Sequence, residues 1–340
     1  MSKKTNQHKR KIILAGLAAI FVFLFLYFFL YFIYSPADRQ HKKTYTIEIL
    51  KGYSFSQITD SLYGSGLIKN RLFFYILAIS TNKAGHIKAG EYELTTLMSP
   101  WDILDKLVKG EIKYYEIRIP EDSTLREVAA RLASCKLVDK DNFLNTASDQ
   151  TFLASMGITG PTAEGFLFPD TYKFNHSMNA KDMLKKMVDR FWEMVTPEMI
   201  EQAEKMKMSA LQFVTLASII GREAGTIEEK RLVSAVFHNR LEKKMRLQSD
   251  PTAVYDMENF QGSVTKSHLK RKSPYNTYLV DGLPPGPIGN PGLDSLKAAI
   301  NPASVPYLYF VSNNNGTHQF SSSFLEHNKA VLKYQIEKEK

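Results

Sequence analysis

The pattern of apolar and polar positions separates one long apolar run near the N-terminus from many short periodic segments. Residues 12–34 carry no charged side chain and are rich in aromatic residues. About 23 residues at a rise of about 1.5 Å each span a bilayer core of about 30 Å. The run is longer than the apolar core of a cleaved signal peptide, roughly 7 to 15 residues, and no small-residue cleavage pattern follows it. We therefore predict a transmembrane helix that remains as an anchor.

Positive charges near this run predict its orientation. More of them precede the apolar run than follow it, and cytoplasmic flanks of membrane helices are enriched in Lys and Arg. The preceding residues are Lys3, Lys4, Lys9, Arg10 and Lys11, and the following ones are Arg39, Lys42 and Lys43. The N-terminus is expected in the cytoplasm, and nearly all of the remaining chain outside it.

An internal repeat appears when residues 45–74 are aligned without a gap on residues 115–144. Each copy begins with alternating apolar residues, which are typical of a strand, and continues with apolar residues at helical spacing. The matched positions are Tyr45, Ile47, Ile49, Phe55, Ile58, Leu62 and Phe73 with Tyr115, Ile117, Ile119, Leu125, Val128, Leu132 and Phe143. Two strand-turn-helix units are predicted, with a chance match of common patterns as the alternative.

Short signals place further elements around these copies. A strand is predicted at 90–94, and the sequence Ser-Pro-Trp at 99–101 predicts the start of a helix. In the second copy, Asp122 or Ser123 is expected to cap the helix that follows.

From about residue 150 the pattern predicts mainly helices, at 180–192, 197–208, 211–225, 293–299 and 324–336, with a strand at 307–312. Thr226 and Glu229 match a capping box, so a second helix should begin directly after the one ending at Gly225. Residues 283–292 contain so many Pro and Gly that a rigid loop is expected. The fold class is therefore α+β behind a single membrane helix.

Glu223 is the most informative residue of the predicted 211–225 helix. It follows Ile219 and Ile220 by four and three residues, so it lies on the apolar stripe of that helix. Apolar surroundings and the nearby C-terminus of the helix both favour the protonated carboxyl, which suits a general acid near neutral pH. The alternative is a structural acid paired with Arg231 or Arg246.

Composition excludes several other kinds of function. The hydrophobic share is 44% and the charged share 23%, as in ordinary globular proteins. The single Cys135 rules out an internal disulfide and any CxxC motif. The formal charge of +9 has no accompanying nucleic-acid-binding motif, so nucleic acid is not expected as a partner.

No GxSxG, HExxH, P-loop or GxGxxG motif is present, and the eight histidines lack ligand spacing, so neither a metal nor a cofactor is expected.

Three segments could contact a substrate rich in hydroxyl groups. Segment 164–172 combines turn residues with aromatic residues, which could stack on sugar rings or pack into the core. Segments 245–252 and 273–278 offer amide, hydroxyl and carboxylate groups. These groups could bind a ligand or stabilise turns.

The sequence resembles a known family, the endolytic murein transglycosylases of the YceG-like type, along essentially the whole chain. Six ordered blocks carry the resemblance: Glu164-Gly-Phe-Leu-Phe-Pro-Asp-Thr-Tyr172, Ala217-Ser-Ile-Ile-Gly-Arg-Glu223, Arg246-Leu-Gln-Ser-Asp-Pro-Thr252, Tyr275-Asn-Thr-Tyr278, Gly282-Leu-Pro-Pro-Gly286 and Pro306-Tyr-Leu-Tyr-Phe-Val311. It implies a cytoplasmic tail (1–11), a transmembrane helix (12–34), a LysM-like α/β module (44–113), a second repeat-like unit (114–150) and a mixed α+β catalytic domain (151–340).

The resemblance also implies a mechanism and a site. Glu223 would act as acid and then base, cutting the bond between N-acetylmuramic acid and N-acetylglucosamine inside nascent glycan strands of peptidoglycan to leave 1,6-anhydro ends. The family pattern has Glu-Lys where this chain has Gly221 and Arg222, so an acid near Glu223 is missing. As substrate-binding residues we predict Glu164, Gln248, Asp250, Asn276 and Tyr278.

The implied location is the bacterial cytoplasmic membrane, with the catalytic domain in the periplasm or outside the cell. Peptidoglycan strands are the expected substrate, and peptidoglycan synthases or other cell-wall machinery are the expected partners. A noncatalytic peptidoglycan-binding scaffold and a hydrolytic muramidase remain as alternatives.

Overall fold

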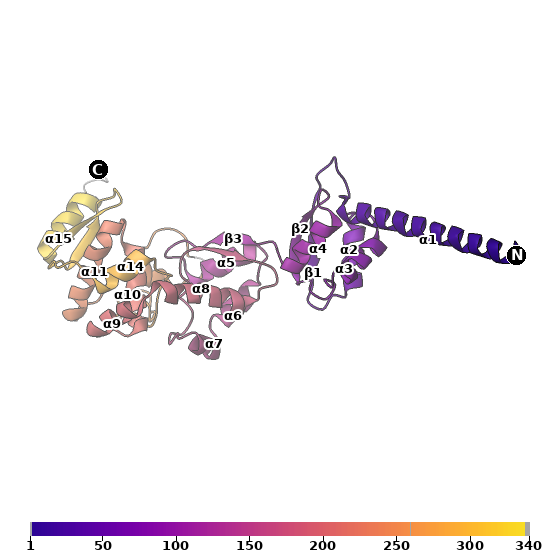
Figure 1. Ribbon diagram of the computed structural model, residues 1–340. Helices are drawn as coiled ribbons and strands as arrows, with labels where there is room; N and C mark the ends of the chain where they lie inside the picture. Colours follow the sequence, from indigo (N-terminus) through magenta and orange to yellow (C-terminus); the bar gives the residue numbers. More distant parts are fainter. Residues whose placement is uncertain (1, 259, 337–340) are drawn as a thin grey trace. The chain divides into compact units, whose positions relative to one another are not determined.

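The computed structural model describes the backbone of residues 2–258 and 260–336, which form two compact units. The first unit contains the chain up to Tyr115 together with Asn175–Ser177, and the second contains Glu116–Phe174 and the chain from Met178 onward. Helices dominate both units, and each also contains short strands, so the α+β prediction is confirmed (Figure 1). Residues 337–340 of the predicted catalytic domain lie outside the described residues.

The predicted anchor lies within a single long helix, α1 (Ser2–Tyr34). Its segment Ile12–Tyr34 has a mean hydropathy of 2.8 and is long and apolar enough to cross a membrane. The side chains of Lys3, Lys4, Lys9, Arg10 and Lys11, on which the predicted orientation rests, lie outside the described part of the chain.

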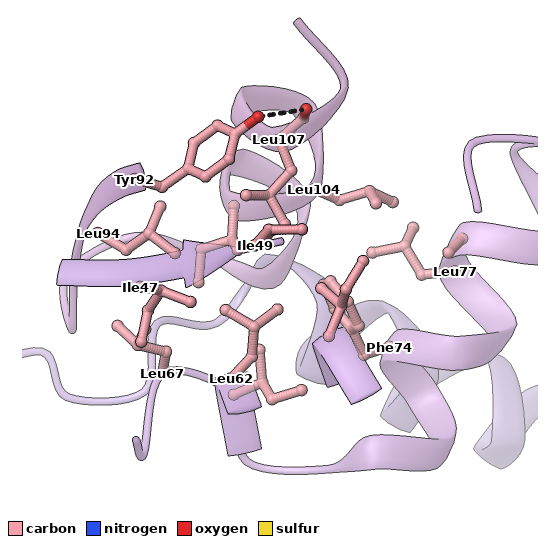
Figure 2. Close-up of a cluster of buried hydrophobic side chains, with 14 of the residues drawn as sticks. Ile47, Ile49, Leu62, Leu67, Phe74, Leu77, Tyr92, Leu94, Leu104 and Leu107 are labelled. Atoms are coloured by element: carbon pink, nitrogen blue, oxygen red, sulfur yellow. Dashed lines mark hydrogen bonds between the residues drawn. The ribbon is translucent and has the colours of Figure 1, made fainter. Parts of the chain in front are cut away.

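A small hydrophobic core organises the rest of the first unit. Strands β1 (Thr44–Ile49) and β2 (Gly90–Thr95) pair antiparallel, with Thr44 opposite Thr95 and Ile49 opposite Gly90. Their inner side chains pack against α2 (Phe55–Gly64), α3 (Arg71–Ser80) and α4 (Pro100–Lys109), as Figure 2 shows. Buried Tyr92 donates its hydroxyl proton toward the carbonyl oxygens of Lys88 and Leu107, at 2.7 and 3.2 Å. The strand and helix predicted for this region are confirmed.

The two predicted copies have the same local structure. The second copy consists of β3 (Tyr115–Arg118), α5 (Leu125–Ser134) and α6 (Lys140–Thr146), in the order found for β1, α2 and α3. Ser54 and Thr124, at matching positions, cap α2 and α5 through complete capping boxes with Gln57 and Glu127. The prediction that Asp122 or Ser123 caps α5 is wrong, because the hydroxyl of Thr124 accepts the hydrogen bond from the Glu127 amide.

The second unit is mainly helical, and two small sheets complete it. Strand β3 pairs with β4 (Thr171–Phe174), and β5 (Tyr309–Ser312) pairs antiparallel with β6 (His318–Ser321). The sequence pattern predicted β5 but not β6. The other elements are α7 (Gln150–Ser155), α8 (Ala180–Met194), α9 (Pro197–Lys205), α10 (Ala210–Glu223), α11 (Ile227–Glu242), α12 (Asp250–Val254), α13 (Lys266–Leu269), α14 (Leu293–Ile300), α15 (Phe324–Val331) and the π-helical turn η1 (Leu332–Ile336).

Helix α10 is the central helix of this unit. Every residue from Phe213 to Ile220 is buried, so the helix is covered all round and not along the single stripe that the pattern predicted. It contacts α9, α11, α12 and α14. A central helix of this kind is a rigid support for a side chain at its end.

The predicted loop at 283–292 is confirmed, and it packs against segment 164–172. The side-chain oxygen of Asn290 accepts hydrogen bonds from the amides of Gly165 and Leu167, at 3.0 and 2.9 Å. The aromatic residues of the segment, Phe166, Phe168 and Tyr172, are 1%, 6% and 4% exposed. They belong to the core, so the hypothesis that they stack on sugar rings is wrong.

Candidate active site

Glu223 is the last residue of α10, at a sharp turn into α11. Residue 225 must be glycine for a packing reason, because a Cβ atom at that position would lie 2.1 Å from the carbonyl oxygen of Gly316. The predicted start of α11 is confirmed, but the predicted capping box is wrong. The Glu229 carboxylate instead accepts hydrogen bonds from the backbone amide and the ring Nδ1 of His318, at 2.6 and 2.9 Å.

The carboxyl group of Glu223 is held by a hydroxyl group and not by an ion pair. The Ser249 hydroxyl donates to Glu223 Oε1 at 2.5 Å. Within the described ranges 2–258 and 260–336, no salt bridge includes Glu223. The two arginines of the structural alternative lie elsewhere: Arg231 donates to the carbonyl oxygen of Asn301, and Arg246 pairs with Asp281. Glu223 is thus available for proton transfer.

Its surroundings raise the pKa of Glu223 to about 7. Burial is the main cause, because a charged carboxylate loses contact with water. The Ser249 hydrogen bond opposes this by lowering the pKa, and the negative charge of Asp250 raises it again. Near neutral pH both protonation states of Glu223 are therefore populated, as one group that serves in turn as acid and base requires.

Two of the predicted substrate-binding residues lie next to this carboxyl group. Asp250 follows Ser249 and is exposed, and the Tyr278 hydroxyl donates to Asp250 Oδ1 at 2.5 Å. The half-buried Tyr278 ring places its hydroxyl at the rim of the site, and burial, followed by the Asp250 bond, raises its pKa. Glu223, Ser249, Asp250 and Tyr278 thus form one connected group of side chains, which we call the acid cluster.

Gln248 and Asn276 lie beside the acid cluster in different ways. Gln248 is exposed, has a positive φ of 49° and donates its backbone amide N–H to the Thr277 carbonyl oxygen at 3.1 Å. Asn276 is fully buried and donates its side-chain amide to the carbonyl oxygens of Leu269 and Arg271, at 3.1 and 2.8 Å. Its Oδ1 accepts from the Tyr278 amide at 3.1 Å, so Asn276 positions the loop that carries Tyr278.

Glu164 lies in a separate buried network. Its carboxyl oxygens each accept from the Leu125 amide at 2.9 Å, and the Tyr255 hydroxyl and the Asn290 amide donate at 2.8 and 3.2 Å. Burial raises the pKa of Glu164 to about 7, while the Leu125 amide is the largest of the influences that lower it. Glu164 therefore connects the start of α5, the end of α12 and loop 283–292 through hydrogen bonds.

Glu164 also lines a cavity of about 440 Å³, to which Arg126, Lys140 and Arg222 contribute. Glu223 is not among its lining residues, so the cavity is distinct from the acid cluster. The five predicted substrate-binding residues are thus not all together: Asp250, Tyr278 and Gln248 lie at the acid cluster, Asn276 lies beneath it and Glu164 lies in the separate network.

The unusual Gly221 has a packing reason. A Cβ atom at position 221 would lie 2.0 Å from Asp122 Oδ1, because the Asp122 carboxyl group rests against α10 there. Asp122 has a positive φ of 60°, and its backbone is held by Asn290, whose carbonyl oxygen accepts from the Asp122 amide at 2.8 Å. The glycine keeps its intrinsic helix cost of up to about 1 kcal/mol relative to Ala, but a side chain here would collide.

We expect Gly221→Ala to destabilise the second unit by about 1–2 kcal/mol, because the Asp122 side chain must move to admit the new methyl group. Urea unfolding followed by fluorescence measures the change. In the double variant Gly221→Ala/Asp122→Ala most of the loss caused by the alanine at 221 should disappear. Equal losses from Gly221→Ala in both backgrounds would contradict the packing explanation.

Two residues of this region had not been singled out by sequence reasoning. Ser249, the hydrogen-bond donor to Glu223, lies inside the block Arg246–Thr252, and its position directly before Asp-Pro was the only available signal. Asn290 bonds both Glu164 and the backbone of segment 164–172. It lies in a Pro/Gly-rich loop, where an asparagine is typical of a turn.

Comparisons with known proteins found one matching family model and several similar proteins. The model of the YceG-like family matches residues 47–333. The endolytic murein transglycosylase of Bacillus subtilis (strain 168) is 33% identical over 318 residues, which cover 89% of this chain and 88% of that protein. The endolytic murein transglycosylase of Streptococcus pneumoniae serotype 2 (strain D39) is 28% identical over 331 residues, which cover 88% of this chain and 60% of that protein.

A solved structure is also similar. The crystal structure of a yceG-like protein from Listeria monocytogenes is 35% identical to this chain, with a TM-score of 0.59. The similarity covers 85% of this chain and all of that one.

Proposed function

Because the chain belongs to the YceG-like family, we propose that it cuts nascent peptidoglycan strands internally from a membrane anchor. It is a peptidoglycan lytic transglycosylase, the enzyme class named for its curated relatives. The observation that supports a site on this chain is the acid cluster, in which Glu223 has a pKa of about 7 and a hydroxyl partner.

In the proposed reaction Glu223 begins protonated and donates its proton to the oxygen between N-acetylmuramic acid and N-acetylglucosamine. As that C–O bond breaks, the C6 hydroxyl of the same muramic residue attacks the anomeric carbon and returns its proton to Glu223. The product is a 1,6-anhydro end, and no water is consumed. A single carboxyl group suffices because it serves as acid and base in sequence, which a pKa of about 7 permits.

The neighbours of Glu223 have distinct proposed roles. Gln248 and Asp250 are exposed and Tyr278 lies at the rim, so these three offer hydrogen bonds to sugar hydroxyl and acetamido groups. Asn276 and Glu164 support substrate binding through the loops that they hold, since their polar atoms already bond to protein groups.

The segments that precede the catalytic domain are proposed to hold the enzyme at the membrane. Helix α1 contains the apolar segment of a single-pass anchor, and the proposed arrangement has the N-terminus in the cytoplasm and the catalytic domain (151–340) in the periplasm or outside the cell. The LysM-like module (44–113) and the segment that contains the second copy of the repeat (114–150) would bind glycan or position the catalytic domain. Peptidoglycan synthases are the proposed partners in the membrane.

Mass spectrometry of peptidoglycan digested with the purified protein tests the reaction. We expect fragments that end in 1,6-anhydro-N-acetylmuramic acid. Reducing ends without anhydro sugar would favour a hydrolytic muramidase, an alternative that the second carboxylate, Asp250, beside Glu223 keeps open. Binding to glycan without cleavage would favour the noncatalytic scaffold.

Removing the Ser249 hydroxyl should shift the pH profile in a defined direction. Activity requires protonated Glu223 in the first step, so kcat/KM should fall as the pH rises through about 7. The Ser249 hydrogen bond lowers the pKa of Glu223, so Ser249→Ala should raise it and move this decline to higher pH. The profile of kcat/KM against pH on isolated glycan strands measures the shift.

The matched control is Ser234→Ala, which removes another fully buried serine hydroxyl, one bonded to the Ala298 carbonyl oxygen. Its alkaline decline should stay at the wild-type pH. A decline at lower pH in Ser249→Ala would be inconsistent with the assigned hydrogen bond.

A further inference from the structure

Helix α3 of the first unit is apolar on two opposite sides. Its inner face, Phe74, Leu77 and Ala78, belongs to the core around β1 and β2. Its outer face is also apolar, although solvent-facing helix surfaces normally carry polar residues. Leu72, Tyr75 and Ile79 form that outer face at helical spacing, and they are 63%, 44% and 58% exposed.

The flank of α3 contacts the apolar helix α1 through one aromatic residue. The ring of Phe73 lies 6.2 Å from that of Phe25, 6.0 Å from that of Phe29 and 5.0 Å from that of Phe32, between ring centroids. All three partners belong to the segment Ile12–Tyr34 that can cross a membrane. Figure 1 shows α3 in the same unit as α1.

These contacts fix the depth of α3 relative to the anchor. At about 1.5 Å per residue, Phe29 lies about 8 Å and Phe25 about 14 Å before the end of the apolar segment at Tyr34. A side chain that touches both must lie below the outer edge of the membrane whenever α1 spans it. Helices that lie in the membrane surface bury their apolar face by about 5–10 Å in the same way.

We propose that α3 lies in the outer interface of the membrane, with Leu72, Tyr75 and Ile79 in contact with lipid acyl chains. The inference rests on the proposed anchor and goes beyond the proposed reaction. The bilayer is the occupant of this face because the neighbouring helix α1 continues the same apolar surface into the membrane. The first unit is then attached by two elements, which limits its tilting away from the membrane.

Fluorescence quenching in lipid vesicles tests this contact on the full chain. In a Cys135→Ser background, which removes the single cysteine, one new cysteine at a time carries an environment-sensitive nitrobenzoxadiazole label. The test position is Ile79→Cys. Exposed Glu93→Cys on β2 is the aqueous control, and Phe21→Cys within the apolar segment is the membrane control. Vesicles of phosphatidylcholine provide the quencher, with a nitroxide near the headgroup end of the acyl chain for position 79, near its methyl end for position 21, or with no nitroxide.

We expect the label at position 79 to lose most of its emission in nitroxide-containing vesicles, while the label at position 93 loses little. Water-like emission at 79 with strong quenching at 21 would overturn the lipid contact and leave the anchor intact. Water-like emission at both positions would overturn the anchor as well. A blue-shifted but unquenched signal at 79 would also overturn the proposal, because it would indicate that protein, such as a second copy of the chain, covers this face.

Discussion

Replacement of Glu223 by glutamine is expected to lower the rate of glycan cleavage by about 10³-fold, within the range of about 10²–10⁴ that proton transfer by a positioned side chain contributes. Glutamine has nearly the same shape and still accepts the hydrogen bond from the Ser249 hydroxyl, so the fold should be unaffected. It cannot donate a proton to the glycosidic oxygen or receive one from the C6 hydroxyl. Quantification of anhydro ends over time measures the loss.

The matched control is Glu242→Gln, at the exposed end of α11. It makes the same chemical change and should retain wild-type activity. The thermal unfolding curves of both variants should match the wild type. Full activity of Glu223→Gln would falsify the assignment of the acid, whereas loss of activity in both variants would point to a general effect of the substitutions.

Replacement of Glu164 by alanine is expected to have the largest effect on stability, about 3 kcal/mol of unfolding free energy. The change leaves the Leu125 amide, the Tyr255 hydroxyl and the Asn290 amide without their common acceptor inside the protein. Trp192 lies in the second unit, so urea unfolding followed by its fluorescence in a Trp101→Phe background reports on that unit alone.

Glu164→Gln separates hydrogen bonding from charge at the same position. Its side-chain oxygen can accept from the Leu125 and Asn290 amides, and its NH2 group can donate to the Tyr255 hydroxyl oxygen, so most of the stability should remain. The pKa of Glu164 is raised from 4.5 to about 7, so the folded wild type holds a proton that the unfolded chain has lost between these pH values. Wild-type stability should therefore fall as the pH rises from 4.5 to 7, and Glu164→Gln should fall less. Parallel stability curves for the two proteins would show that Glu164 does not titrate as assigned.

Local pattern predicted much of the helical structure correctly. The apolar segment at 12–34, the copies at 45–74 and 115–144, and the start of α11 all depend on residues close together in the chain. Caps were less certain, because several neighbouring side chains can compete for the same amide. Thr124 caps α5, and the carboxylate of Glu229 turns to His318. Strand β6 is short and follows a turn, which leaves too few residues for a recognisable alternation.

The sequence by itself determined the candidate acid. A carboxyl group on an apolar helix is unusual enough to be recognised from spacing, and the resemblance to a family gave Glu223 its expected role. The sequence predicted one buried stripe on α10, but burial of this helix on all sides exceeds what one stripe can encode.

Only the tertiary structure decided how Glu223 and Glu164 differ. Both carboxyl groups are surrounded by protein and both have a pKa raised to about 7, yet one bonds a single hydroxyl beside exposed polar residues and the other bonds three buried groups. These partners come from segments far apart in the chain, so no local pattern contains them. The same holds for Gly221, whose missing side chain is explained by Asp122, which chain folding brings against α10.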